Sequence, residues 1–137
     1  MRRAYETEND RQQERLLASK LEAQGHKVYI LKPYYPCDFL IKSSNGSTFI
    51  AEYKKRSHDF GTYPSVMITA LKVANCKSLA SAMNVKFCFL VEFNDGLYIT
   101  SKVSGSVEYS GRKDRGDVSD MEPYIMVPLD NFIRIYY

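Results

Sequence analysis

The most constraining stretch of the chain is residues 36–57, "PCDFLIKSSNGSTFIAEYKKRS". Two short runs rich in Phe, Ile and Thr flank an Asn-Gly pair, a pattern that predicts a β-hairpin. Asp38 stands at the head of the first predicted strand, and Glu52 and Lys54 stand near the end of the second. Alternate residues of a strand share a face, so Glu52 and Lys54 point one way and Tyr53 the other. The hairpin therefore aims a carboxylate and an ammonium at one spot.

The register of this hairpin decides whether Asp38 joins them. A two-residue turn of Asn45 and Gly46 would place Asp38 opposite Tyr53, on the wrong face. A three-residue loop or a bulge would instead place Asp38 opposite Lys54 and diagonal to Glu52. If these groups share one site, we therefore expect an odd loop, a bulge or a strand bend in the hairpin.

Such a site has a recognisable chemistry. Two carboxylates beside a backbone carbonyl are hard oxygen ligands that suit Mg²⁺ or Mn²⁺. A bound metal lowers the pKa of its water and stabilises charge on phosphorus, and a nearby lysine orients that water. Asp38, Glu52 and Lys54 would then form a phosphodiester-cleaving set. The alternative is a cross-strand salt bridge between Glu52 and Lys54 on an exposed face, worth at most about 1 kcal/mol.

An amphipathic helix is expected over residues 8–24, with Leu17 and Leu21 on its apolar stripe and Gly25 as its stop signal. One turn earlier the same face presents Glu14 and then Asp10. A buried carboxylate needs a partner or a metal. Alternatively, this face emerges into solvent at the helix start, where acids suit the helix dipole.

The rest of the chain predicts further elements. They are a strand over 26–36 ended by prolines, a helix over 65–84, a central strand over 86–93, a hairpin partner over 97–103, a charged loop over 109–122 and an extended tail over 123–137. Ser65 is the expected N-cap of the second helix. Its expected core-facing positions are Ile68, Leu71, Asn75, Leu79 and Ala82. This order predicts an α/β fold in which helices cover the faces of a mixed sheet.

Length and composition limit the alternatives. A chain of 137 residues with 45% hydrophobic and 26% charged residues predicts a single domain over 1–137, with its core at about 8–101. It has no apolar run of membrane-spanning length and no signal-peptide pattern at its start, so we expect no membrane contact and a cytoplasmic location. Three cysteines without a CxxC pair favour reduced thiols and argue against structural zinc. The net charge of +3 permits nucleic-acid binding without requiring it.

These residues resemble the PD-(D/E)XK nuclease superfamily, in which an acidic residue opens one strand and Glu-x-Lys follows on the next. Here the pattern is Asp38, thirteen intervening residues, then Glu52, Tyr53 and Lys54. The chain departs from the family in one detail, since Cys37 separates Pro36 from Asp38. Many members, archaeal Holliday junction resolvases among them, also carry a glutamate on the first helix. Glu14 stands in the matching place, so the resemblance covers roughly residues 8–92.

The resemblance implies a restriction-endonuclease-like α/β/α sandwich with a central mixed β-sheet, and a metal-dependent DNA endonuclease. In that family pattern Asp38, Glu52 and the Tyr53 carbonyl would hold Mg²⁺ or Mn²⁺. Glu14 would support a metal or its water, and Lys54 would assist the attacking water.

The resemblance also implies contacts to the substrate. Lys72 would meet the scissile phosphate or the metal-bound water. Lys55 and Arg56 either continue a solvated strand end or meet phosphate beside the site. DNA contact is a further hypothesis for the charged loop, through Arg112, Lys113 and Arg115.

Function has more than one interpretation at this level. The substrate would be duplex or branched DNA, with recombination or junction processing among the roles, and a homodimer is compatible with the family. Similarity to small phage proteins of the superfamily suggests a phage origin and action in the host bacterial cytoplasm. The alternatives are a catalytically inactive DNA- or protein-binding module, such as an anti-defence protein, and an RNA-directed nuclease.

Overall fold

The computed structural model describes residues 8–111 and 121–136. Its elements in chain order are α1 (Glu8–Ala23), β1 (Lys27–Ile30), β2 (Phe39–Lys42), β3 (Thr48–Lys55), β4 (Ser65–Thr69), α2 (Ala70–Met83), β5 (Lys86–Phe93), β6 (Gly96–Thr100), β7 (Ser106–Gly111), β8 (Met121–Pro128), the short 3-10 helix η4 (Leu129–Asn131) and β9 (Ile133–Tyr136). No helix within these ranges is long and apolar enough to cross a membrane.

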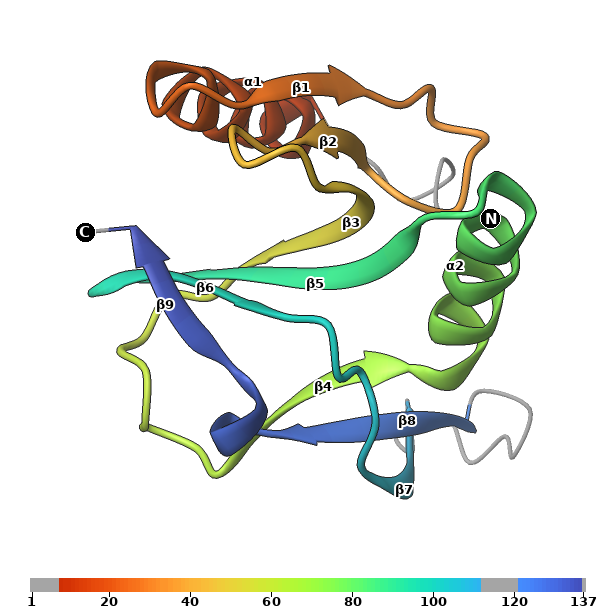
Figure 1. Ribbon diagram of the computed structural model, residues 1–137. Coiled ribbons are helices and arrows are strands. Elements are labelled where there is room, and N and C mark those ends of the chain that lie inside the picture. Colours follow the sequence, from red (N-terminus) through yellow and green to blue (C-terminus); the bar gives the residue numbers. More distant parts are fainter. Residues whose placement is uncertain (1–7, 112–120, 137) are drawn as a thin grey trace.

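The main sheet has six strands in the order β1-β2-β3-β5-β6-β9. Strands β3 and β5 pair in parallel, and the other neighbours pair antiparallel. The expectation of a central mixed sheet is therefore confirmed. The β3–β5 pair is parallel because the chain returns through a crossover that includes β4 and α2, whereas short turns join the antiparallel pairs β2–β3 and β5–β6 (Figure 1).

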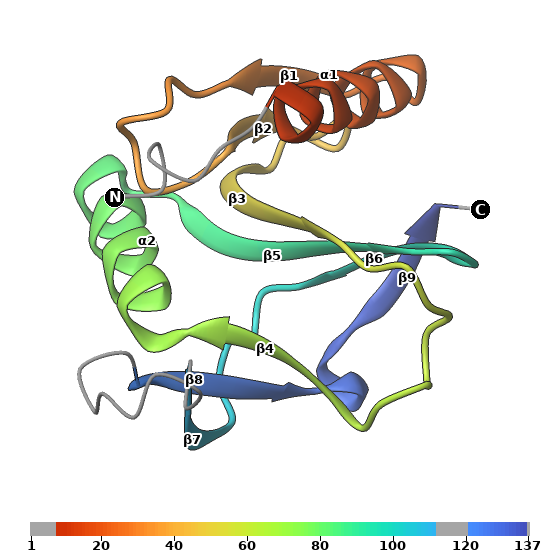
Figure 2. The same ribbon diagram turned by 180° about the vertical axis from the view of Figure 1, so that it is seen from behind.

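Helices and a second sheet cover the two faces of the main sheet (Figures 1 and 2). On one face, Leu17 and Leu21 of α1 pack in a cluster with Leu90 of β5. On the other face, Val73 of α2 packs with Phe89 of β5 and with residues of β4 and β8. Neighbouring residues of β5 thus enter opposite clusters. This confirms β5 as a central strand that is covered on both sides.

The first helix is also confirmed. It ends at Ala23, two residues before Gly25, which has φ +93° and so turns the chain toward β1. Strand β1 is shorter than expected and ends at Ile30, ahead of the prolines.

The three-stranded second sheet, ordered β4-β8-β7, was not expected. Residues 65–69 form β4 rather than the start of a helix, so Ser65 is not an N-cap. The cap of α2 is Thr69, whose Oγ1 accepts the backbone N–H of Lys72 at 3.2 Å. Burial alternates along β4, with Val66 and Ile68 inside, and this strand pattern depends on pairing with β8.

The expected apolar face of the second helix is only partly right for the same reason: Leu79 packs against the core, whereas Leu71 and Asn75 are exposed. The expected face takes its helical spacing from Ile68, which lies on β4 and not on α2. The buried residues of α2 are Val73, Cys76 and Ala80, whereas Leu71 is 67% exposed.

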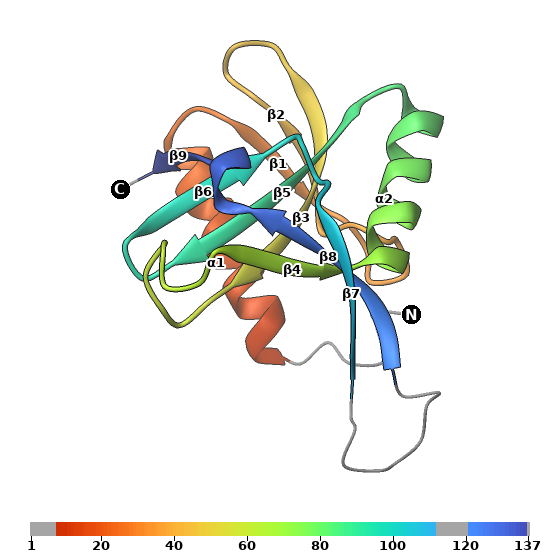
Figure 3. The same ribbon diagram turned by 90° about the horizontal axis from the view of Figure 1, so that it is seen from below.

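The prediction of a loop over 109–122 is wrong at both ends. Strand β7 continues to Gly111, and β8 begins at Met121 and pairs with β7 along its length (Figure 3). Residues 112–120, with Arg112, Lys113 and Arg115, lie outside the described residues. The tail does form strands, as expected, but η4 divides it between the two sheets.

The hairpin of β2 and β3 has the expected odd loop. The N–H of Ser43 donates to the Ser47 carbonyl at 2.8 Å, which closes a three-residue loop over 44–46. Phe39 pairs with Ala51, so Asp38, one residue beyond, lies next to Glu52. The expected position opposite Lys54 is therefore wrong, because the register shifts in the other direction. The shared face of the two acids is nevertheless confirmed.

Candidate active site

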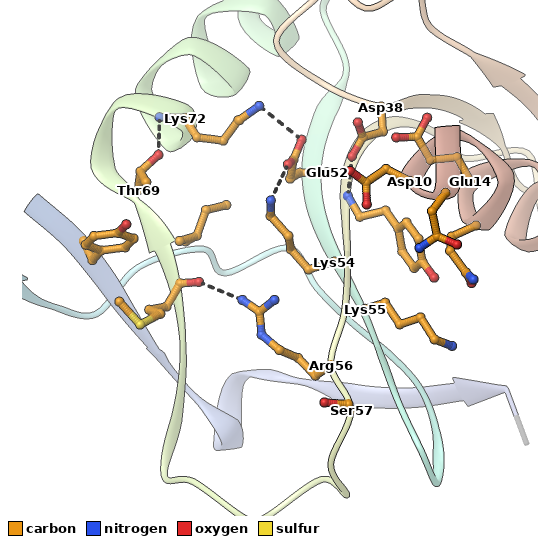
Figure 4. Close-up of a pocket in the computed structure, with 16 residues that line it drawn as sticks. Asp10, Glu14, Asp38, Glu52, Lys54, Lys55, Arg56, Ser57, Thr69 and Lys72 are labelled. Carbon is orange, nitrogen blue, oxygen red and sulfur yellow. Dashed lines mark hydrogen bonds and ion pairs between the residues drawn. The ribbon is translucent and has the colours of Figure 1, made fainter. Parts of the chain in front are cut away.

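A cleft of about 870 Å³ opens where the start of α1, the residue before β2, the end of β3 and the start of α2 converge. Its principal polar lining residues are Asp10, Gln13, Glu14, Asp38, Glu52, Lys54, Lys55, Arg56, Ser57, Thr69 and Lys72. Figure 4 shows Asp10, Glu14 and Asp38 gathered near α1, and Lys72 reaching toward the central Glu52 from α2. The fold thus brings the expected residues of the α1 helix, the hairpin and the α2 helix to one cavity: Glu14, Asp38, Glu52, Tyr53, Lys54, Lys55, Arg56 and Lys72.

Asp38 is fixed to the neighbouring strand. It is 4% exposed, and its Oδ2 accepts the backbone N–H of Tyr53 at 2.8 Å. Its own N–H donates to the Ala51 carbonyl at 3.1 Å. These bonds hold the carboxylate beside Glu52.

Glu52 is the most deeply buried acid of the cleft, at 2% exposure. Its Oε1 lies 3.7 Å from the Lys72 ammonium, and its Oε2 lies 3.8 Å from the Lys54 ammonium (Figure 4). Oε1 accepts no hydrogen bond from any described residue. Burial, and then the nearby Asp38 carboxyl, raise the pKa of Glu52 to about 8, with the two lysines acting in the opposite direction.

Lys72 links α2 to the entry of β2. Its ammonium donates to the Pro36 carbonyl at 3.1 Å while it faces Glu52. The helix start at Thr69 sets this position, since Lys72 is the residue whose N–H bonds the Thr69 hydroxyl. Thr69 was missed from the sequence because its role depends on where the helix begins.

Glu14 projects from α1 into the same cleft and is 7% exposed. The alternative that this face of the helix emerges into solvent is therefore wrong at Glu14. It holds one turn earlier, at Asp10, which is exposed but also lines the cleft. The helix thus presents an inner and an outer carboxylate to the cavity.

The basic side chains at the end of β3 point alternately to the two faces of the sheet. Lys55 extends away from Glu52 and approaches Glu92 Oε1 at 3.7 Å (Figure 4). Arg56 donates to the Met67 carbonyl at 3.4 Å, and burial lowers the pKa of its guanidinium. Arg56 therefore borders the cleft on the same side as Lys54, and Lys55 lies at its margin.

Cys37 departs from the expected Pro-Asp pair without disturbing the site. It is fully buried, and hydrogen bonding with the Cys76 thiol, together with burial, raises its pKa. The Cys37 thiol therefore stays protonated, and all three cysteines of the chain are free.

The donors in the cleft suit a hard divalent cation. Within 8–111 and 121–136, no group of three or more His, Cys, Asp and Glu side chains is arranged to hold a metal by itself. Mg²⁺ usually needs only one or two carboxylates, because waters and substrate phosphates complete its shell. Asp38 and Glu52 supply these, and Glu52 Oε1 is a buried oxygen that lacks a hydrogen bond. The residues present therefore fit such an ion.

Comparison with solved structures identifies the class. Seven solved chains match this one, among them Hjc of Archaeoglobus fulgidus, a Holliday junction resolvase from an archaeal hyperthermophile. The match has a TM-score of 0.53 and 15% sequence identity, and it covers 64% of this chain and 72% of the resolvase. This likeness shows the fold, which is restriction-endonuclease-like.

Comparison with family models identifies the family. The model described as "Phage putative PDDEXK endonuclease" matches residues 1–135. The chain belongs to this family of phage PD-(D/E)XK endonucleases. Comparison with curated proteins gives no match.

Proposed function

We propose that this protein is a metal-dependent DNA endonuclease and that Asp38 and Glu52 hold its Mg²⁺ or Mn²⁺. The observation that carries the proposal is Glu52, a buried carboxylate beside Asp38 whose Oε1 accepts no hydrogen bond from the described residues. Burial of such a group is costly unless a cation compensates it. The Tyr53 carbonyl follows directly on the chain and would complete the protein ligands, and Glu14 would support the ion or its water.

The side chains divide the remaining work. A divalent cation supplies an acidified water and charge stabilisation at phosphorus. Lys54, which is held near Glu52, would orient the attacking water. Lys72 and Arg56 border the side of the cleft that lies away from α1 (Figure 4). They would bind the phosphate whose charge develops during cleavage. Lys55, at the margin, would contact a neighbouring phosphate.

The family supports DNA as substrate, and the resolvase-like fold supports branched DNA as one form to test. Phage origin would place the activity in the host bacterial cytoplasm, and a homodimer stays a prediction. The competing interpretations are an RNA-directed nuclease and an inactive binding module. The same assay separates all of them.

The test is cleavage of supercoiled plasmid, a synthetic four-way junction and a structured RNA, each with Mg²⁺, Mn²⁺ or EDTA. Wild type would be compared with Glu52→Ala and Lys54→Ala. Lys77→Ala is the matched control, because Lys77 is an exposed lysine on α2 that does not line the cleft.

We expect metal-dependent cleavage of DNA that both site variants abolish and the control retains. Cleavage of RNA alone would favour the RNA-directed interpretation. A folded wild type that cuts no substrate with either metal would contradict the proposal and favour a binding module.

A further inference from the structure

We propose that Glu92 is a positioning residue for this site and that it acts across the sheet through Tyr53. The inference rests on the proposed function. Glu92 lies on β5, is 4% exposed, and does not line the cleft. It is the only acid in the run "KFCFLVEF", whose other buried side chains are all apolar.

Glu92 joins three elements. Its Oε1 accepts the Tyr53 hydroxyl of β3 at 2.6 Å, and its Oε2 accepts the Lys20 ammonium of α1 at 3.0 Å. Its backbone carbonyl also accepts the N–H of Arg56 at 2.8 Å. These bonds are short and two of them are charge-assisted, which is the strong class of hydrogen bond.

The ring of Tyr53 packs on one face of the sheet, whereas its backbone contacts a residue of the cleft on the other face. Its ring packs in the α1-side cluster with Leu17 and Leu90, whereas Glu52 faces the cleft on the other side. Its backbone N–H holds the Asp38 carboxylate at 2.8 Å, and its carbonyl is the proposed third ligand. Fixing the ring therefore fixes the peptide groups that orient the metal-binding acids.

The Lys20 contact extends this effect to the helix. Lys20 is on α1, the helix that carries Glu14 into the cleft. The Lys20–Glu92 ion pair holds that helix against β5, whose neighbour β3 carries Glu52. Glu92, which does not line the cleft, thus helps to fix α1 and its Glu14 relative to the strand that carries Glu52.

A purely structural role would have a different signature. Buried charges cost free energy to desolvate, and apolar residues of similar volume often stabilise a core equally well. A residue that only fills the core should affect the free energy of unfolding. A residue that orients metal ligands should affect metal affinity even when the fold is intact.

The test uses Glu92→Gln and Tyr53→Phe in the full chain. Each keeps the side-chain size: Tyr53→Phe removes the donor of the 2.6 Å hydrogen bond, and Glu92→Gln replaces its charged acceptor, which also pairs with Lys20, by a neutral amide. Glu8→Gln is the matched control, because Glu8 carries the same charge and forms exposed ion pairs with Arg11 and Arg15 on α1. The measurements are Mn²⁺ affinity from the EPR signal of the free ion, kcat and KM for plasmid, and the thermal midpoint.

We expect each variant to bind Mn²⁺ roughly 10- to 100-fold more weakly, with kcat lowered and KM for DNA nearly unchanged. The double variant should lose less than the sum of the two single losses, because Tyr53 and Glu92 share one hydrogen bond. If Glu92→Gln does not fold, Tyr53→Phe decides the question.

Unchanged Mn²⁺ affinity in a folded Tyr53→Phe or Glu92→Gln protein, beside a wild type that binds Mn²⁺, would overturn the positioning role alone. A wild type that binds no Mn²⁺ would overturn the proposed function and this inference with it. The wild-type titration therefore distinguishes the two failures.

Discussion

The ammonium of Lys72 lies 3.7 Å from Oε1 of Glu52 and donates to the carbonyl of Pro36 at 3.1 Å. One side chain of α2 therefore contacts both the segment that leads to Asp38 and the most buried acid of the cleft. In the metal-free protein the two lysines beside Glu52 supply the positive charge that a divalent cation would bring.

Replacing Lys72 should therefore separate metal binding from catalysis. We expect Lys72→Met to bind Mn²⁺ several-fold more tightly, because it removes a positive charge near the proposed ligands, and to cut DNA at least about 10-fold more slowly. EPR titration and single-turnover cleavage measure the two effects. The control is Lys77→Met, an exposed position on α2. Weaker Mn²⁺ binding by Lys72→Met would contradict this account.

Asp38 accepts the Tyr53 N–H and is a proposed metal ligand, and different substitutions separate the two roles. Asp38→Asn keeps an oxygen that can accept the Tyr53 N–H, so its free energy of unfolding should change little while Mn²⁺ affinity falls. Asp38→Ala leaves that buried N–H without its acceptor and should cost about 1–3 kcal/mol. Urea denaturation beside Mn²⁺ titration measures both. Equal destabilisation by the two substitutions would show that the Tyr53 bond is unimportant.

The pH dependence of stability should report on Glu52. Its pKa is about 8 in the fold against an ordinary value of 4.5, so the folded protein binds more protons than the unfolded chain between these values. The free energy of unfolding contributed by this group falls as pH rises through that window and is constant above it. In EDTA, Glu52→Gln should show a shallower fall than wild type. Identical urea-midpoint profiles from about pH 5 to 9 would be incompatible with a buried, protonated Glu52.

Bound metal should oppose this loss of stability at higher pH. A cation that binds the folded protein raises its thermal midpoint by mass action, and protons compete for the same carboxylates. We expect Mg²⁺ or Mn²⁺ to raise the midpoint more at pH 8 than at pH 6, and EDTA to remove the increase. Calorimetry of wild type and Glu52→Gln measures this. A shift of equal size in both proteins would place the cation elsewhere.

The hairpin residues could be predicted because strand geometry is local. Alternation alone puts Glu52 and Lys54 on one face, and the Asn-Gly pair marks the loop that brings Asp38 to that face. The direction of the register shift could not be predicted, since it depends on how the 44–46 loop closes between Ser43 and Ser47.

The second sheet could not be predicted because it depends on distant pairing. Residues 65–69 are as apolar as the helix that follows, and only their ladder with β8 makes them a strand. Glu92 did leave a local signal, as one acid in an otherwise apolar buried strand. Its partners Tyr53 and Lys20 come from other elements, so its contacts appear only in the fold.

The proposal that Asp38 and Glu52 hold a divalent cation can be tested directly. The most direct measurement is Mn²⁺ binding at about pH 8, followed by EPR, for wild type and Glu52→Gln without nucleic acid, since it requires no knowledge of the substrate. We expect saturable binding by wild type and at least about 100-fold weaker binding by the folded variant. Equal binding by the two proteins, or none by wild type, would contradict it.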